Sequence, residues 1–271
     1  MNRKVYAVIG SPVHHSKSPD IYNYLFKKHG LNGTYISIEL TKDNLPEFID
    51  TYAPAMNLAG INVTMPLKDA VAKTATNLDK TSSLLGAVNT LDLTTGKGYT
   101  TDGKGMVLSL IYQGFNIKDK NIVVMGAGGA AKSVVYELSQ HSPASLTVLN
   151  RTKEKAQDLA DMAGNVQADS LFEINKYINN CDLLINCTSM GMSGKPQMDL
   201  SLADCLNSNT FVYDIIYEPR ETELLKKAKA KGCKISNGID MLICQALYAF
   251  EIYTGILPNK EDRDELIEML S

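Results

Sequence analysis

The pattern of apolar and polar positions changes period repeatedly along the chain. Short apolar runs, typical of buried strands, are followed by longer stretches in which apolar residues recur every three to four positions, typical of amphipathic helices. This alternation predicts an α/β fold. In the first part of the chain we expect strands at residues 4–10, 34–40 and 60–65 and helices at residues 19–29, 43–52 and 66–76.

The stretch AVNTLDLTTGKGYTTDG, residues 87–103, interrupts this alternation. Two short β-runs flank the glycine-containing turn TGKG at residues 95–98. Two β-runs joined by such a turn predict a hairpin, whose strands pair antiparallel. The first sheet is therefore expected to be mixed.

A stricter alternation follows from residue 103 onward. The expected strands are 121–125, 146–150, 182–187, 210–216 and 233–236, and the expected helices are 104–114, 129–140, 152–163, 221–232 and 238–255. The last of these helices is mostly apolar, but Asp240, Gln245 and Glu251 interrupt it. It is therefore interpreted as a helix buried between domains, not as a membrane span.

With 271 residues, the chain is long enough for two modest domains with proper cores. It contains no internal repeat and no low-complexity linker. We expect one domain to combine residues 1–101 with residues 239–271, and the second to comprise residues 102–238. The two domains are expected to be separated by a cleft.

Composition and charge exclude several classes of protein. The net charge is −3 and no basic stripe is present, so nucleic acid is not expected as a partner. No apolar run is long enough for a membrane span or a signal peptide, which makes a cytoplasmic location the default. The odd number of cysteines, without C-x-x-C or histidine at ligand spacing, predicts reduced and mostly buried thiols and no metal site.

The segment NIVVMGAGGAAKSVVYELSQ, residues 121–140, places a strand, a glycine turn and a helix in succession. Gly126, Gly128 and Ala131 match G-x-G-x-x-G/A, the dinucleotide-binding fingerprint. The first glycine permits the tight turn, the second lets the backbone approach a pyrophosphate, and the small third residue allows close helix–strand packing. The pyrophosphate would lie at the helix N-terminus, where free N–H groups favour anions.

The end of the next strand distinguishes NADP from NAD. NAD-binding folds place Asp or Glu there to accept from the ribose 2′-hydroxyl. Here the sequence is Asn150, Arg151 and Thr152, with Lys155 one helical turn further on. An arginine can stack on adenine and pair with a 2′-phosphate. We therefore predict NADP, and we expect Thr152 also to cap the following helix.

Polar residues gather in the first domain at positions where a core role is awkward. In GSPVHHSKSP, residues 10–19, Ser18 is expected to cap a helix that Pro19 begins, which leaves Ser16 without a structural task. Lys68 lies in the first turn of a helix and opposes its dipole, and Asp102 follows the hairpin. The remaining members are amides and a hydroxyl, at Asn62, Thr64 and Asn89. Together these groups can bind a polyol and move a proton, which beside a nicotinamide cofactor describes a dehydrogenase of a polyhydroxylated alcohol.

A co-linear series of motifs over nearly the whole chain resembles the shikimate dehydrogenase family. The motifs are GSPVHHSKSP, INVTMPLK, GAVNT, TDGKG, GAGGAA, NRT, NCTSMGM, YDIIYEPRETELL and NGIDMLICQALYAFEIYTG. The resemblance implies NADPH-dependent reduction of 3-dehydroshikimate to shikimate, a step of chorismate and aromatic amino acid biosynthesis. It also implies an N-terminal substrate domain with a mixed sheet, completed by the C-terminal helices, and a Rossmann-like NADP-binding domain.

Carried over residue by residue, the resemblance gives each polar group a role. Lys68 and Asp102 would form the catalytic pair, while Ser16 and Ser18 would bind the substrate carboxylate. Asn62, Thr64, Asn89 and Gln245 would hold the ring hydroxyls, and Tyr217 would close on the carboxylate side. The cofactor would contact Gly126, Ala127, Gly128, Gly129, Ala130, Asn150, Arg151, Thr152, Lys155, Thr188, Ser189, Met190, Ile215, Gly238 and Met241. For Met241, helix packing is an alternative interpretation.

Three departures and two rival functions accompany the resemblance. Thr101, Lys132 and Tyr253 occupy positions where the family more often has Asn, Arg and Trp. A quinate/shikimate dehydrogenase with NAD use is one alternative, although Thr64 and the Asn-Arg-Thr signature favour shikimate and NADP. A non-catalytic NADP-binding sensor is the other, but such a protein would be expected to lack Lys68 or Asp102. Both a monomer and a homodimer are compatible with the sequence.

Overall fold

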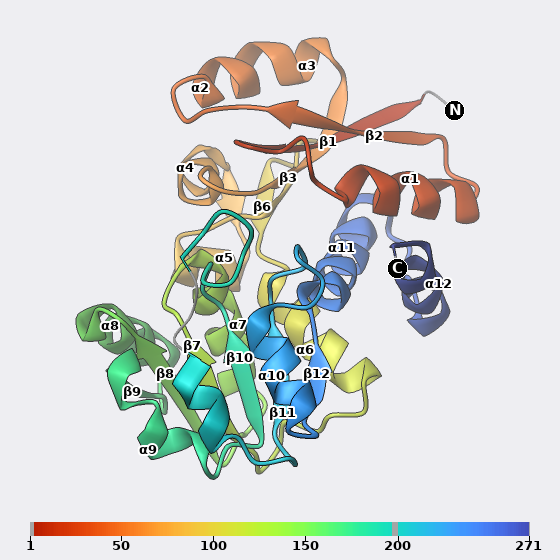
Figure 1. The fold of residues 1–271 in the computed structure, drawn as a ribbon. Helices are drawn as coiled ribbons and strands as arrows, with labels where there is room; N and C mark the ends of the chain where they lie inside the picture. Colours follow the sequence, from red (N-terminus) through yellow and green to blue (C-terminus); the bar gives the residue numbers. More distant parts are fainter. Residues whose placement is uncertain (1–2, 197–199, 271) are drawn as a thin grey trace. The chain divides into compact units, whose positions relative to one another are not determined.

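A computed structural model of the chain describes residues 3–196 and 200–270, and these divide into two compact units (Figure 1). Unit 1 comprises Met1–Gly105 and Ile243–Ser271, and unit 2 comprises Met106–Leu242. The two boundaries between the units, after Gly105 and after Leu242, lie inside helices, a few residues beyond the domain limits expected from the sequence. At Gly105 a Cβ atom would lie 2.6 Å from the Gln245 backbone nitrogen, and this close approach ties both helix segments to unit 1.

Unit 1 is built on a mixed six-stranded sheet in the order β2-β1-β3-β5-β6-β4. The strands β1, β2 and β3 are parallel, and β5 pairs antiparallel with both β3 and β6, as the hairpin predicted. The strands are β1 (Lys4–Gly10), β2 (Gly33–Glu39), β3 (Leu58–Val63), β4 (Asn77–Leu78), β5 (Thr90–Asp92) and β6 (Lys97–Tyr99).

Each face of this sheet is covered by a different group of helices, in keeping with the alternation of side chains along a strand. On one face, Ala7, Ile9 and Ile61 belong to an aliphatic core. The opposite face carries the aromatic rings of Tyr6 and Tyr35, which pack with rings of helices α1 and α11. The helices with residues in unit 1 are α1 (Ser18–Lys28), α2 (Leu45–Glu47), α3 (Ala53–Ala55), α4 (Lys68–Thr74), α5 (Lys80–Leu85), α6 (Asp102–Tyr112), α11 (Gly238–Thr254) and α12 (Lys260–Leu270).

Two parts of unit 1 differ from the sequence prediction. The single helix expected at residues 43–52 is instead α2, a π-helical segment η1 (Phe48–Tyr52) and α3. Between α4 and the hairpin, the structure has the short strand β4 and helix α5, which were not predicted. The signal for α5 was present, since the Asp79 side chain accepts from the Ser82 N–H and Gly86 ends the helix at φ 61°.

Unit 2 contains an all-parallel six-stranded sheet in the order β12-β11-β10-β7-β8-β9, which is the Rossmann order. Successive strand residues enter two separate cores, Ile122 and Val124 on one face and Val123 and Met125 on the other. The strands are β7 (Asn121–Met125), β8 (Ser145–Asn150), β9 (Gln167–Ser170), β10 (Leu183–Asn186), β11 (Phe211–Asp214) and β12 (Lys234–Ser236). The expected α/β fold, with one mixed and one Rossmann-like sheet, is confirmed.

Helices cover both faces of the second sheet. They are α7 (Gly129–Ser139), α8 (Lys153–Ala163), η2 (Leu171–Glu173), α9 (Asn175–Ile178), η3 (Leu200–Cys205) and α10 (Glu223–Ala230). Strand β9 and the short helices after it were missed by the sequence reading, because they are brief and weakly periodic. The five thiols are free and four are buried, as expected. No helix in the described ranges is long and apolar enough to cross a membrane.

Candidate functional site

Lys68 is the first residue of α4, and its side chain extends to Asp102. Leu67, which precedes the helix, is fully buried and anchors the turn. The Lys68 ammonium donates to Asp102 Oδ2 at 2.5 Å. The two side chains are 22% and 12% exposed, so the pair is accessible from solvent but largely desolvated. The two residues predicted to move a proton are therefore in direct contact.

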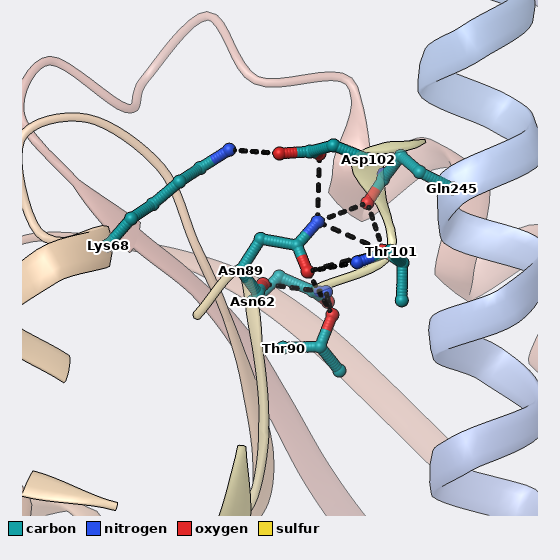
Figure 2. Close-up of polar contacts among 7 residues, drawn as sticks. All are labelled: Asn62, Lys68, Asn89, Thr90, Thr101, Asp102 and Gln245. Carbon is teal, nitrogen blue, oxygen red and sulfur yellow. Dashed lines mark hydrogen bonds and ion pairs between the residues drawn. The ribbon is translucent and has the colours of Figure 1, made fainter. Parts of the chain in front are cut away.

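The second oxygen of Asp102 is held by Asn89, just before β5 (Figure 2). Asn89 Nδ2 donates to Asp102 Oδ1 at 2.8 Å, while the Thr101 backbone N–H donates to Asn89 Oδ1 at 2.9 Å. With one oxygen bound by Lys68 and the other by Asn89, the carboxylate is fixed in orientation. Such charge-assisted hydrogen bonds are the strong ones in proteins.

Asn62 joins the same cluster through its neighbour across the sheet. Asn62 on β3 lies opposite Thr90 on β5, and its Nδ2 donates to Thr90 Oγ1 at 3.0 Å. Thr90 Oγ1 in turn donates to Asn89 Oδ1 at 3.0 Å. On its other side, Asn62 Oδ1 accepts from the Tyr35 hydroxyl at 2.7 Å. Sequence reasoning missed Thr90 and Tyr35, because neither lies in a turn or at a helix end.

Gln245 reaches the cluster from helix α11 (Figure 2). Its Oε1 accepts from Thr101 Oγ1 at 3.2 Å and from Asn89 Nδ2 at 3.3 Å. Thr101 thus bridges two predicted substrate ligands, Asn89 and Gln245. The structure brings five of the predicted residues together in unit 1: Asn62, Lys68, Asn89, Asp102 and Gln245.

The serines of the opening loop take different positions from those expected. Ser18 is the first residue of α1 and makes no capping bond; it is Ser16 Oγ that accepts from the Ser18 N–H, at 3.2 Å. The two hydroxyls are 3.2 Å apart, and Ser18 Oγ also lies near the Tyr35 hydroxyl, where it opposes the rise in the Tyr35 pKa that burial causes. The prediction that Ser18 caps the helix was wrong, since the chain enters one residue earlier and Ser16 supplies the acceptor.

Two further predicted substrate residues lie apart from this hydrogen-bonded cluster. Thr64 comes directly after β3 and packs against the end of β1. A Cβ atom at Gly10 would lie 2.3 Å from Thr64 Cγ2. Tyr217 belongs to unit 2, where burial raises the pKa of its hydroxyl. Their contacts with a substrate stay predictions.

The glycine turn after β7 has the local geometry that a dinucleotide needs. Gly126 adopts φ +106°, and a Cβ there would lie 3.1 Å from the Cys187 backbone, so glycine is required. In contrast, a Cβ at Gly128 or Gly129 would meet nothing within 4 Å. The small residue at the third position, Ala131, is fully buried against the core. The turn at the start of α7 thus leaves open space in front of a helix N-terminus, which fits a pyrophosphate.

At the end of β8, the side chains suit a phosphate better than a hydroxyl. Arg151, Thr152 and Lys155 are exposed, and no carboxylate stands at the strand end, which is Asn150. Asn150 Nδ2 donates to the Thr152 carbonyl at 2.9 Å, which orders the loop before α8. Thr152 occupies the N-cap position but its side chain makes no capping bond, so that part of the expectation was wrong. The residues present fit the 2′-phosphate of NADP.

The loop after β10 is held by a buried polar network that sequence reasoning did not find. Asn186 Oδ1 accepts from the Thr188 N–H at 3.0 Å and from Thr188 Oγ1 at 2.7 Å. Asn186 Nδ2 donates to Asp214 at 3.0 Å, and Thr222 Oγ1 donates to the same carboxyl at 2.7 Å. Burial raises the Asp214 pKa to about 6, although these donors oppose the rise. The signal was a carboxylate at the end of an otherwise apolar strand.

The other predicted cofactor residues are partly gathered around this loop. Gly238 approaches β11 so closely that a Cβ would lie 1.9 Å from the Ile215 carbonyl oxygen. Ser189 is exposed and Met190 half-buried beside Thr188. Met241 packs into the core of unit 2, and its contact with a cofactor stays a prediction. Within the described part of the chain, no three His, Cys, Asp or Glu side chains are grouped as a metal site would need.

Family models match this arrangement along almost the whole chain. The shikimate dehydrogenase substrate binding domain matches residues 8–91, shikimate / quinate 5-dehydrogenase matches residues 109–229, and the shikimate 5′-dehydrogenase C-terminal domain matches residues 238–262. The chain belongs to the shikimate dehydrogenase family. A shikimate dehydrogenase (NADP+) of Methanocaldococcus jannaschii is 40% identical, over 95% of this chain and 94% of that protein.

Solved structures agree with this membership. A shikimate 5-dehydrogenase of Thermus thermophilus in complex with NADP(H) and shikimate is 31% identical, with a TM-score of 0.87 and coverage of 98% of this chain and 99% of that one. A quinate dehydrogenase of Corynebacterium glutamicum in complex with NAD is 30% identical, with the same TM-score and coverage. The expected family, oxidoreductase class and NADP cofactor are confirmed.

Proposed function

We propose that this chain catalyses the reversible NADP-dependent interconversion of 3-dehydroshikimate and shikimate, with Lys68 and Asp102 as the catalytic pair. The observation that carries this proposal is the 2.5 Å contact between Lys68 Nζ and Asp102 Oδ2 inside a cluster of amides and hydroxyls. A lysine and an aspartate in contact beside hydroxyl-binding groups suit proton transfer at a secondary alcohol.

Lys68 acts on the oxygen of the reacting carbonyl. When bound, NADPH supplies the hydride to the carbonyl carbon. As negative charge develops on the oxygen, the Lys68 ammonium stabilises it and donates the proton that completes the alcohol. Asp102 holds the ammonium in place and accepts from a substrate hydroxyl. In the oxidation direction the same lysine takes the proton back.

The polar side chains around this pair bind the substrate. Asn62, Thr64, Asn89 and Gln245 hold the ring hydroxyls, and Ser16 and Ser18 bind the two oxygens of the carboxylate, with Tyr217 on the same side. Ser16 Oγ donates to Ser18 Oγ at 3.2 Å, so the two hydroxyls are adjacent, and by rotating they can both donate to one carboxylate. The two hydroxyls would thus bind the anion by hydrogen bonds alone, without a positively charged side chain.

The glycine turn and the end of β8 bind the cofactor. The N–H groups at the start of α7 bind the pyrophosphate, and Ala127 and Ala130 line the turn. Arg151, with Lys155, pairs with the 2′-phosphate and stacks on adenine. Thr188, Ser189, Met190, Ile215, Gly238 and Met241 line the nicotinamide side.

One steady-state assay tests the proposal against its nearest rival. Oxidation rates are measured for shikimate and quinate, each with NADP+ and with NAD+. We expect kcat/KM to be highest for shikimate with NADP+. An equal or higher value for quinate with NAD+ would contradict the assignment, and no turnover in any pairing would favour a non-catalytic NADP-binding protein.

The cytoplasmic location, the cleft between the domains and the choice between monomer and homodimer stay predictions. We likewise propose that residues 1–101 and 239–271 form the substrate-binding domain and that residues 102–238 form the NADP-binding domain. Asp102 lies in unit 1 together with Asn62, Lys68 and Asn89, which supports its assignment to the substrate-binding part.

A further inference from the structure

The hydrogen bonds that end on Asp102 form one chain in which every donor points the same way. The Tyr35 hydroxyl donates to Asn62 Oδ1 at 2.7 Å, and Asn62 Nδ2 donates to Thr90 Oγ1 at 3.0 Å. Thr90 Oγ1 donates to Asn89 Oδ1 at 3.0 Å, and Asn89 Nδ2 donates to Asp102 Oδ1 at 2.8 Å. Bonds aligned in this way polarise one another and strengthen the whole chain.

The first member of the chain, Tyr35, is rigidly mounted. Its ring stacks on that of Tyr22 with centroids 4.2 Å apart and an angle of 3° between the planes. The side chain is 2% exposed, and burial raises the pKa of its hydroxyl well above the usual value. The hydroxyl therefore stays protonated and acts as a permanent donor to Asn62.

Asn62 has little freedom left once Tyr35 has donated to it. Its Nδ2 protons go to Thr90 Oγ1 and to the Asn89 carbonyl, at 3.0 and 3.3 Å. Only the remaining lone pair of Oδ1 is uncommitted by these bonds. Asn62 can therefore accept from a substrate hydroxyl but cannot donate to it without breaking the chain.

We propose that Tyr35 is a positioning residue for the catalytic pair, acting through Asn62, Thr90 and Asn89 on Asp102. This inference rests on the proposed function of Lys68 and Asp102. It adds a buried tyrosine and a threonine, neither of which touches the reacting atoms, to the groups that set the rate. The Thr101 N–H holds Asn89 from a second side, so loss of the chain weakens the site without dismantling it.

The first test compares two tyrosine-to-phenylalanine variants of the full-length enzyme. Tyr35→Phe removes the first donor and leaves the ring stack. Tyr253→Phe makes the same change in the same aromatic cluster, at a hydroxyl that is buried and has no hydrogen-bond partner among the described residues. We expect kcat for shikimate oxidation to fall about 5- to 10-fold in Tyr35→Phe and less than twofold in Tyr253→Phe.

The KM for NADP+ separates positioning from a general loss of structure. It should stay within twofold of the parent in Tyr35→Phe, because the cofactor residues lie in unit 2. A Tyr35→Phe variant with unchanged kcat, or with a loss matched by Tyr253→Phe, would overturn the proposal.

The second test asks whether Tyr35 acts through Thr90. Thr90→Val removes the hydroxyl that passes the chain on, and Thr90→Ser retains it. We expect Thr90→Val to lower kcat by a similar factor and Thr90→Ser to restore most of it. In the double variant Tyr35→Phe/Thr90→Val, the tyrosine change should cost less than a further twofold.

Multiplied losses in the double variant would show that Tyr35 acts by another route and would overturn the proposal. Ser18, whose hydroxyl lies near that of Tyr35, is the candidate for that route, and Ser18→Ala in the Tyr35→Phe background identifies it. Failure of the proposed function is distinguishable, since it would appear as retained turnover in Lys68→Ala, whatever the tyrosine variants do.

Discussion

The polar cluster of unit 1 and the glycine turn of unit 2 are built on opposite principles. Around Asp102, side chains hold side chains, and the carboxylate oxygens are engaged by Lys68 and Asn89. Around Gly128, the site is made by the backbone and by open space. The predicted substrate-binding groups are therefore ordered by hydrogen bonds to one another, whereas the predicted cofactor site is formed by the backbone and by the space beside the glycines.

This contrast predicts different consequences of substitution in the two units. A change in this cluster alters several hydrogen bonds at once. The Asn89 side chain, for example, contacts Thr101, Asp102 and Gln245. A change at the exposed end of β8 is expected to remove one predicted contact with the cofactor and to leave the fold intact.

The largest effect is expected for Lys68→Ala. Loss of the ammonium removes both the proton donor and the charge that stabilises the developing alkoxide, so kcat should fall about 10²- to 10⁴-fold. NADP+ binding, measured by calorimetry, should stay within about threefold of the parent. Turnover close to that of the parent would remove the lysine from the mechanism.

A smaller and more selective effect is expected for Arg151→Ala. Loss of a charge-assisted pair with the 2′-phosphate should raise KM for NADP+ about 10- to 50-fold and leave KM for NAD+ nearly unchanged. The control is Lys153→Ala, on the same turn, since Lys153 is engaged by Asp169 at 2.9 Å. Equal losses with both cofactors would show that Arg151 does not contact the 2′-phosphate.

Ser16→Ala should have an effect of about 5- to 10-fold, on KM for shikimate, because one of two neutral donors to the carboxylate is lost. KM for NADP+ should not move. Because Ser16 Oγ also accepts from the Ser18 N–H, the Tm should fall slightly as well. Ser11→Ala, in the same loop but bonded to Glu39, is the control, and an unchanged KM in Ser16→Ala would leave the loop a purely structural role.

The smallest effect is on stability and concerns Asp214 in unit 2. Its pKa of about 6 lies above the ordinary value of 3.8, so the folded protein keeps this proton to a higher pH than the unfolded chain. Stability from this group is therefore lost as the pH rises from about 4 to about 6, by about 3 kcal/mol at most.

Asp214→Asn removes that titration. The Tm of the parent, relative to Asp214→Asn, should fall by several degrees between pH 4.5 and pH 7.5, as followed by circular dichroism. A difference that is constant over this range would show that the carboxyl is already ionised at pH 4.5.

Most strands of both sheets and the hairpin could be predicted from the sequence because they depend on local signals, whereas β4 and β9 are too short to give one. The catalytic role of Lys68 and Asp102 stays a prediction. Periodicity located the strands, and Lys68 stood out because a cation opposes the dipole at a helix start. Tyr35 and Thr90 could not be predicted, since each lies inside a strand and acquires its role only from strand pairing. The exchange of roles between Ser16 and Ser18 depended on a shift of one residue in the helix start, which is below the resolution of sequence patterns.

The division of the chain has a consequence for how the protein is made. Unit 1 is discontinuous, since its aromatic face packs Tyr6 and Phe26 against Tyr253 and Phe250 of α11. During synthesis the first 105 residues leave the ribosome long before that helix exists, while unit 2 is contiguous and complete by residue 242. Unit 2 can therefore be complete before unit 1, and the cluster around Asp102 acquires Gln245 only after all of unit 2 has been synthesised.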